Sequence, residues 1–116
     1  MNETRQQDII WVKIPYSDME GAKFRPALVV SNDPYNNKHL GIIVCAITSN
    51  IDKQEFGIIF DNSNLISGKI HLKSKVRADK VMSIEKTLVV KSFARLNNKT
   101  FDSVIEEVIK LMRRNK

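Results

Sequence analysis

Three features of the sequence combine residue types suited to phosphate chemistry. Arg25 stands where a polar segment meets an apolar run, so its guanidinium would project from a junction of loop and strand. Thr48 and Ser49 end the most apolar run and place two hydroxyls at a strand end. Glu20 lies five residues before Arg25. An arginine, a hydroxyl and a carboxylate that meet at one end of a barrel can bind a phosphodiester and move its protons.

Each of these features also has an ordinary structural explanation. Threonine favours strands whether or not a site is present. A loop glutamate near an arginine is usually a solvated ion pair worth about 0–1 kcal/mol. From the residue types alone, the structural explanation is preferred for each.

Other kinds of chemistry find little support in the sequence. His39 and His71 are far apart, neither has a His or Cys at ligand spacing, and the acidic residues form no hard-cation cluster, so we expect no metal site or cofactor. The four glycines form no phosphate-binding loop and no nucleophile elbow. Cys45 has apolar neighbours, which predicts a buried core residue rather than a reactive thiol.

The charge is unevenly distributed along the chain. The formal net charge is +6, yet residues 1–66 carry −2 and residues 67–116 carry +8, which favours one basic face and an anionic partner. Within residues 69–77, apolar side chains alternate with basic ones, so a strand here would present a basic ribbon on one face. Such a ribbon fits an anion-binding surface and equally an edge strand whose lysines block aggregation. The pattern leaves both interpretations open.

The apolar patterning predicts strands followed by one helix. Residues 32–38 are dense in turn formers and are expected to form a loop. An amphipathic helix is predicted from Phe101 to Met112, with Asn97 or Asn98 as its cap and Arg113 and Arg114 at its negative end. We expect strands over residues 8–14, 25–31, 41–48, 55–60, 69–84 (one strand, or two with a bend) and 88–96.

This order of elements defines the fold class. Strands and helices do not alternate, which argues against a doubly wound parallel sheet. We predict a mainly β (α+β) fold, a small bent antiparallel barrel covered by a C-terminal helix. At 116 residues and without repeats or long linkers, the chain is expected to be one domain over residues 1–116.

The apolar segments and the cysteine count suggest where the protein works. The longest apolar run, Ile42 to Ile47, has six residues, far fewer than the ~20 of a membrane-spanning helix. The first eight residues contain no apolar stretch, so no secretory signal is expected. One cysteine cannot make a disulfide framework. We therefore expect a cytoplasmic protein without membrane attachment.

The order and wording of several segments resemble the MazF/PemK family of toxin endoribonucleases. A strand rich in β-formers leads through a polar loop into Arg-Pro-Ala-Leu-Val-Val-Ser-Asn at residues 25–32, which resembles the Arg-Pro-x-Leu-Val-x-Ser-Asn segment of that family. Ile-Thr-Ser at 47–49 resembles the end of a later family strand, and 76–86 resembles the segment that follows. The similarity covers roughly residues 7–112.

The resemblance implies a barrel of the kind shared by MazF, PemK and the gyrase poison CcdB. It further implies a homodimer that cleaves single-stranded RNA without metal, by attack of the ribose 2′-hydroxyl, leaving 2′,3′-cyclic phosphate and 5′-hydroxyl ends. An antitoxin protein with an acidic, disordered tail is the expected partner. By motif position, Arg25 matches the phosphate-binding arginine that also supplies the leaving-group proton, Thr48 matches the active-site threonine, and Glu20 matches a loop carboxylate proposed as the general base.

The general base is the weakest of these assignments. Free glutamate titrates near ~4.3, and a neighbouring arginine lowers its pKa further, so RNA binding would have to raise it by desolvation. Glu20, Asp79 and water all stay open as the base. RNA contacts are expected from the loop flanks, the strand end and the basic segment: Tyr16, Ser17, Lys23, Phe24, Ser49, Lys73, Ser74, Lys75, Arg77, Asp79 and Lys80.

The sequence also departs from the family pattern. Gln7 stands where family members usually have glycine, a change expected to matter little, and Lys23-Phe24 is bulkier than the residues common before the arginine. Two other functions are kept as alternatives: a non-enzymatic gyrase poison of the CcdB kind, and an RNA-binding barrel without activity. CcdB-like chains lack the loop glutamate and Arg-Pro arrangement, which counts against the first.

Overall fold

The computed structural model describes residues 4–15, 22–52 and 56–116, and within them the chain forms one seven-stranded antiparallel sheet and two α-helices. Two short 3₁₀ turns, Asn62–Asn64 and Lys86–Leu88, connect strands. The elements are β1 (Asp8–Pro15), β2 (Ala22–Val29), α1 (Asp33–Lys38), β3 (Gly41–Thr48), β4 (Gly57–Phe60), β5 (Leu65–Gly68), β6 (Ser74–Glu85), β7 (Val89–Leu96) and α2 (Asn98–Met112).

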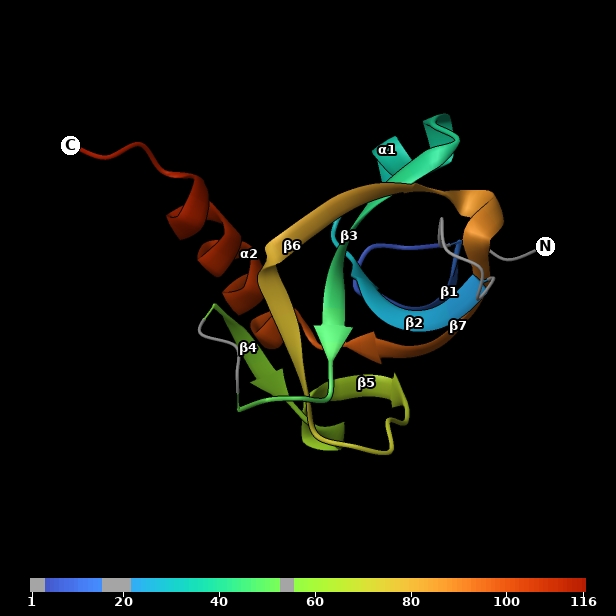
Figure 1. Cartoon of the computed structure of the whole chain (residues 1–116), viewed down its shortest axis with the longest axis horizontal. Helices are drawn as coiled ribbons and strands as arrows, with labels where there is room; N and C mark the ends of the chain where they lie inside the picture. The colour runs from blue at the N-terminus through green and yellow to red at the C-terminus, as the bar shows by residue number, and fades with distance from the viewer. Residues whose placement is uncertain (1–3, 16–21, 53–55) are drawn as a thin grey trace.

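The strands follow the order β4-β6-β3-β2-β1-β7-β5, and each neighbouring pair is antiparallel. Figure 1 shows the sheet curling round on itself, with the long β6 arching from the α2 side across to the turn before β7. The pairing shifts register along β6 and β7, and such bulges increase the local bend of a strand. The fold is therefore the predicted mainly β, half-closed barrel with a C-terminal helix.

The curled sheet has an apolar cluster on each side, as the alternation of side chains along its strands requires. On β3, Cys45 and Ile47 belong to the cluster beneath α2, while Ile42 and Val44 point to the other side. That second cluster lies inside the curl, where Leu88 and Val89 close it from the far side. The curled sheet therefore packs against two separate apolar cores, one on each face.

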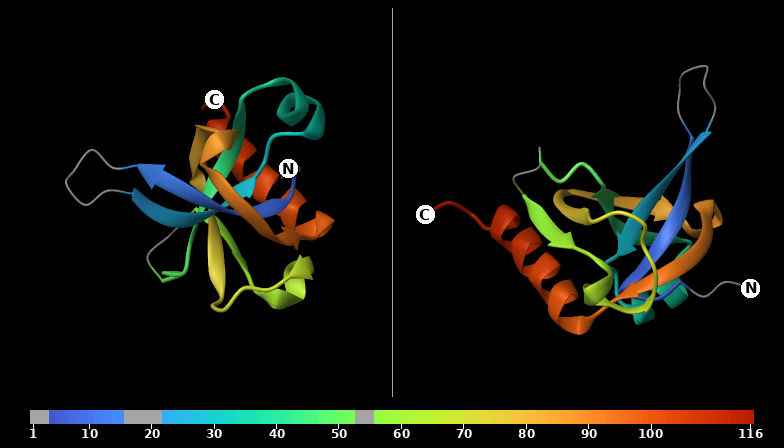
Figure 2. Two further views of the ribbon diagram at one scale, coloured as in Figure 1. Left: turned by 90° about the vertical axis from the view of Figure 1, so that its right-hand side faces the viewer. Right: turned by 90° about the horizontal axis from the view of Figure 1, so that it is seen from below.

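Helix α2 confirms the prediction made from its periodicity. The Asn97 side chain accepts a hydrogen bond from the Thr100 backbone N–H at 2.8 Å, which caps the helix start. Phe101 and Val104 are buried in the cluster that β3 shares, and Figure 2 shows the helix lying beside β4. No helix in the described part of the chain is long and apolar enough to cross a membrane.

Three expectations about the elements need correction. Residues 33–38 form α1 rather than a loop, because Asn32 caps the helix by accepting from the Tyr35 N–H and Pro34 suits its first turn. The strand expected from residue 69 begins only at Ser74, since the backbone at Ile70 is held by the Asn62 side chain instead of a sheet partner. The short edge strand β5 was not predicted.

Gln7 has a left-handed backbone, with φ of +80°. This region costs a residue with a Cβ about 1–2 kcal/mol relative to glycine, which explains why the resembled family carries glycine here. In this chain the Gln7 side chain donates to the Leu96 carbonyl and to Asn98 Oδ1, both at 2.9 Å. The substitution therefore matters more than the sequence suggested: it introduces strain and two compensating contacts.

We expect Gln7→Ala to lower the free energy of unfolding by about 1–2 kcal/mol, because it removes both hydrogen bonds and keeps the strained φ. Gln7→Gly loses the same bonds but relieves the backbone, so it should be about 1 kcal/mol more stable than Gln7→Ala. Urea unfolding of the two variants measures the difference. Equal stabilities would contradict the backbone argument.

Candidate active site

Arg25 and Thr48 lie on the neighbouring strands β2 and β3 and line the same pocket. Strand β2 pairs with β3 through Ala27 with Ala46, and continuing this register by two residues brings Arg25 opposite Thr48. Both line a pocket of about 310 Å³. The sheet register thus unites the two sequence features that suggested phosphate chemistry.

The Thr48 hydroxyl is oriented by its own turn. The Asn50 backbone N–H donates to Thr48 Oγ1 at 3.1 Å, which uses a lone pair of that oxygen. The hydroxyl proton remains available to donate to a ligand, since a hydroxyl carries one donor and two acceptor sites. Because Thr48 lines the pocket, its hydroxyl can donate a hydrogen bond to an anion bound there.

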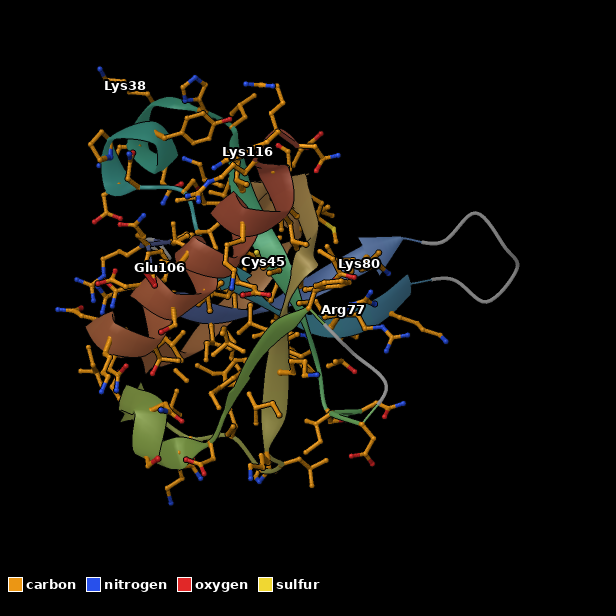
Figure 3. All side chains as sticks on the ribbon, turned by 90° about the vertical axis from the view of Figure 1, so that its left-hand side faces the viewer. Lys38, Cys45, Arg77, Lys80, Glu106 and Lys116 are labelled. Carbon is orange, nitrogen blue, oxygen red and sulfur yellow. The ribbon has the colours of Figure 1, made fainter. Side chains whose placement is uncertain are left out.

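Two further cations reach the same pocket from the bend of β6. Cys45 pairs with Val81, but Ile47, only two residues along β3, pairs with Val76, so β6 carries extra residues at this point. Arg77 and Lys80 lie within this bulge and line the pocket with Arg25 and Thr48. Figure 3 shows both side chains on the side of β6 where the β1–β2 hairpin lies. The bulge turns part of the basic segment toward the pocket.

Arg77 is fixed by a two-point contact with Asp79. Its Nε donates to Oδ1 at 3.1 Å and its Nη2 donates to Oδ2 at 2.8 Å. This hydrogen bonding lowers the pKa of Asp79 and raises the pKa of Arg77. Asp79 is thus held as a carboxylate with both oxygens engaged, and it orients Arg77 without itself lining the pocket.

The pocket floor is apolar and was not identified from the sequence. It is the surface of the inner cluster, and its members share one face of β1, β2, β3 and β6. Counting in steps of two forward from Arg25 to Ala27 and back from Thr48 to Val44 would have indicated part of it, since same-face residues alternate. The floor residues are Val12, Ile14, Ala27, Val44, Met82 and Ile84.

The remaining residues that the sequence predicted for the site are not among the described residues that line the Arg25 pocket. Glu20, Tyr16 and Ser17 lie outside the described residues. Lys23 and Phe24 are exposed on β2 just before Arg25, with Phe24 49% exposed. Ser49 does not line the pocket of Arg25 but a second hollow.

The sequence predicted a continuous basic strand face over residues 69–77. This prediction is wrong, because the strand begins only at Ser74. Lys73 is exposed in the loop before β6, and Ser74 is buried, its hydroxyl donating to the Leu72 carbonyl at 2.8 Å. Lys75 is only 5% exposed, because β4 covers it and its stem lies against the space that Gly57 leaves open. Only Arg77 of this alternation lines the pocket.

Cysteine and histidine offer no further chemistry in the described residues, where no group of three or more His, Cys, Asp or Glu is arranged to hold a metal ion. Cys45 is fully buried, and burial raises the pKa of its thiol to about 11. This agrees with the core position expected from its neighbours.

The Cys45 thiol is therefore expected to be inert in the folded protein. With a pKa about three units above pH 8, roughly one thiol in a thousand is ionised, and burial excludes the reagent as well. Reaction with a chromogenic disulfide should be absent under native conditions and complete in guanidinium. Native-state reaction at the rate of a free cysteine would contradict this placement.

A family model described as the PemK-like, MazF-like toxin of type II toxin-antitoxin systems matches residues 5–112. The chain therefore belongs to this toxin family, as the resemblance indicated.

Solved structures with the same fold include further toxins of this kind. MazE–MazF of Deinococcus radiodurans shares 21% identity over 94% of this chain and 95% of that chain, with a TM-score of 0.77. An endoribonuclease in complex with its cognate antitoxin, from mycobacterial species, shares 17% over 97% and 95%, with a TM-score of 0.71. The Mycobacterium tuberculosis toxin MazF-mt6 shares 15% over 94% and 99%, also at 0.71. No curated protein sequence matches the chain.

Proposed function

We propose that the protein is a sequence-specific, metal-independent endoribonuclease toxin that cleaves single-stranded RNA. The observation that carries the proposal is that Arg25, Arg77 and Lys80 line the same pocket as Thr48, and that none of the described residues in the lining is acidic. Guanidinium groups match the geometry of phosphate oxygens and keep their charge at cellular pH. The pocket therefore suits one phosphodiester of an RNA strand.

In the proposed reaction the ribose 2′-hydroxyl attacks the adjacent phosphorus. The new bond forms between the 2′ oxygen and phosphorus, the bond to the 5′ oxygen breaks, and the products carry a 2′,3′-cyclic phosphate and a 5′-hydroxyl. Negative charge builds up on the phosphoryl oxygens in the transition state, where the three cations and the Thr48 hydroxyl stabilise it. In the role that the resemblance gives it, Arg25 supplies the proton that the leaving 5′ oxygen takes up. The proton that the base removes from the 2′-hydroxyl restores the guanidinium through solvent, so that no net proton is consumed and Arg25 is charged again after each turnover.

The 2′-hydroxyl proton needs an acceptor, and the chemistry of the residues at the pocket reduces the number of candidate bases. Thr48 cannot accept a proton near neutral pH. Asp79 is a poor base, because both its oxygens accept hydrogen bonds from Arg77 and its pKa is lowered. Glu20, which the resemblance assigns to this role, and water are the bases we retain.

The proposal includes partners. The toxin family belongs to type II toxin–antitoxin systems, and two of the solved structures that resemble this chain are complexes with MazE or a cognate antitoxin. We infer that an antitoxin with an acidic, disordered tail neutralises this protein, and that the toxin works as a cytoplasmic homodimer. A net charge of +6 favours association with such a tail.

The experiment that tests the proposal is incubation of a long single-stranded RNA with the purified protein in excess EDTA. Discrete fragments are the expected result. A folded protein that binds RNA and leaves it intact would favour an inactive RNA-binding barrel. A folded protein that neither binds nor cleaves RNA but inhibits DNA gyrase would favour a poison of the CcdB kind.

A further inference from the structure

Met82 brings a sulfur-bearing side chain into the lining of the Arg25 pocket, and no other described residue of that lining contains sulfur. It lies on β6 opposite Val44 of β3 and packs against the inner apolar cluster, and part of it stays exposed. The proposed cleavage reaction gives this side chain no role. A thioether nevertheless adds a chemistry that its aliphatic neighbours lack, because its sulfur can take up an oxygen atom.

The strand places Met82 beside the cations of the pocket. Met82 and Lys80 are two residues apart on β6, and both line the pocket, so their side chains share one face of the strand. Arg25 and Thr48 line the same pocket from β2 and β3. A polar atom added to the Met82 side chain is therefore introduced among the groups that are proposed to bind phosphate.

The pocket supplies hydrogen-bond donors for such an atom. Guanidinium and ammonium groups donate and cannot accept, and none of the described residues in the lining is acidic. Of the ion pairs among the described residues, only that of Arg77 with Asp79 involves a cation of this pocket. An oxygen atom placed here would thus find donors on Arg25 and Lys80 that no described carboxylate holds.

Hydrogen peroxide converts a methionine thioether into a sulfoxide. One peroxide oxygen forms a bond to sulfur while the O–O bond breaks, and the second oxygen leaves as water with both protons. The sulfur loses the two electrons that the peroxide gains. The reaction turns a flexible apolar side chain into a polar one, whose S=O oxygen accepts hydrogen bonds far better than the thioether sulfur does.

We propose that Met82 is an oxidation site through which peroxide closes the Arg25 pocket to RNA. The sulfoxide oxygen would accept hydrogen bonds from Lys80 and Arg25, and it would thereby occupy donors that a phosphate needs. The consequence for RNA cleavage rests on the proposed function. The oxidation itself and its effect on anion binding rest on the pocket alone.

The pocket gives the oxidant access to Met82. Its volume is about 310 Å³, whereas one water molecule takes up about 30 Å³ of the liquid, and hydrogen peroxide is only slightly larger than water. Met112, at the end of α2, is 70% exposed and does not line the pocket. We therefore expect Met112 to oxidise first and Met82 to follow, which makes Met112 an internal control.

The test compares RNA binding before and after treatment of the full-length protein with hydrogen peroxide. Peptide mass spectrometry follows the sulfoxide at Met82, and fluorescence anisotropy measures the binding of a labelled 2′-O-methyl RNA strand, which has no free 2′-hydroxyl to attack. Oxidation of Met82 should weaken this binding about tenfold, since charge-assisted hydrogen bonds to phosphate are lost. Full sulfoxide formation at Met82 with unchanged affinity would overturn the proposal.

Two variants assign the effect to one sulfur. Met82→Leu keeps the floor apolar at similar volume but has no sulfur, so peroxide should leave its affinity unchanged. Met112→Leu removes the exposed methionine outside the pocket and should lose affinity about tenfold, as the wild type does. Each protein is compared with its own untreated sample, and circular dichroism checks that the treated proteins are folded. Equal losses in the wild type and Met82→Leu would place the effect on another residue.

Bound RNA provides a reciprocal measurement. A strand that occupies the pocket covers Met82 and leaves Met112 exposed, so saturating 2′-O-methyl RNA should slow sulfoxide formation at Met82 several-fold and leave the rate at Met112 unchanged. Equal rates at Met82 with and without bound RNA would show that RNA and the sulfoxide do not share a site, which contradicts the proposal.

A second probe separates this proposal from the proposed function. If the untreated protein binds no RNA, the function as a ribonuclease fails, and the same comparison is made with inorganic pyrophosphate by isothermal titration calorimetry. Pyrophosphate binding that weakens on oxidation of the wild type, but not of Met82→Leu, supports the oxidation site independently of RNA. Binding that oxidation leaves unchanged, or no pyrophosphate binding at all, overturns it.

Discussion

Arg25→Ala should reduce the rate of RNA cleavage by about 10²–10⁴-fold while the protein stays folded. The guanidinium faces the pocket opposite Thr48, and the proposal gives it both the phosphoryl oxygens and the leaving oxygen. Its side chain is exposed, so the truncation leaves no cavity in either apolar cluster. Single-turnover cleavage of a labelled oligonucleotide measures the rate.

Two comparisons separate a local effect of Arg25 from a loss of general positive charge. Arg113→Ala removes an exposed arginine at the end of α2, which does not line the pocket, and should cleave at the wild-type rate. Arg25→Lys keeps the charge but loses two-point phosphate contact, and should fall between wild type and Arg25→Ala. Wild-type cleavage by folded Arg25→Ala would remove this residue from the mechanism.

Arg77→Ala has the second-largest expected effect, a loss of about 10–100-fold in kcat/KM. It removes a cation from the pocket and also frees the Asp79 carboxylate, whose negative charge then repels RNA. Removing both groups together restores charge balance, so Arg77→Ala/Asp79→Ala should recover part of the loss.

The pair of single variants and the double variant form a thermodynamic cycle. Positioning of Arg77 by Asp79 predicts strong coupling, with Asp79→Ala harmful only while Arg77 is present. If Asp79→Ala instead abolishes cleavage in both backgrounds, Asp79 acts on the RNA directly. Unchanged kcat/KM in Arg77→Ala would exclude this arginine from the pocket chemistry.

Much of the fold follows from local patterns in the sequence. Residues 41–48 are apolar on both faces because β3 lies at the centre of the sheet with a cluster on either side, and its predicted bounds match the structure. The i, i+3, i+4 periodicity and the cap residue Asn97 likewise predicted α2 correctly. These features depend on neighbours along the chain, which is why they were predictable.

Helix α1 was missed although its cap, Asn32, is local, but the other errors lie where distant residues decide the structure. The basic alternation at residues 69–73 resembles a strand, but Asn62 captures the backbone of Ile70 in a loop. The bulge that turns Arg77 and Lys80 into the pocket depends on how β6 pairs with β3, which no local pattern reveals. Arg25 and Thr48 were predicted individually, but it is the β2–β3 register that brings them together.

The central claim is that the 2′-hydroxyl of the RNA is the nucleophile in a metal-independent cleavage. The most direct measurement compares two oligonucleotides in excess EDTA: an all-RNA strand containing a mapped cleavage site, and the same strand with one 2′-deoxyribose 5′ to the scissile bond. We predict cleavage of the first, with cyclic phosphate and 5′-hydroxyl ends, and an intact bond at that site in the second. Cleavage at the deoxyribose, or 5′-phosphate ends from the all-RNA strand, would contradict the account.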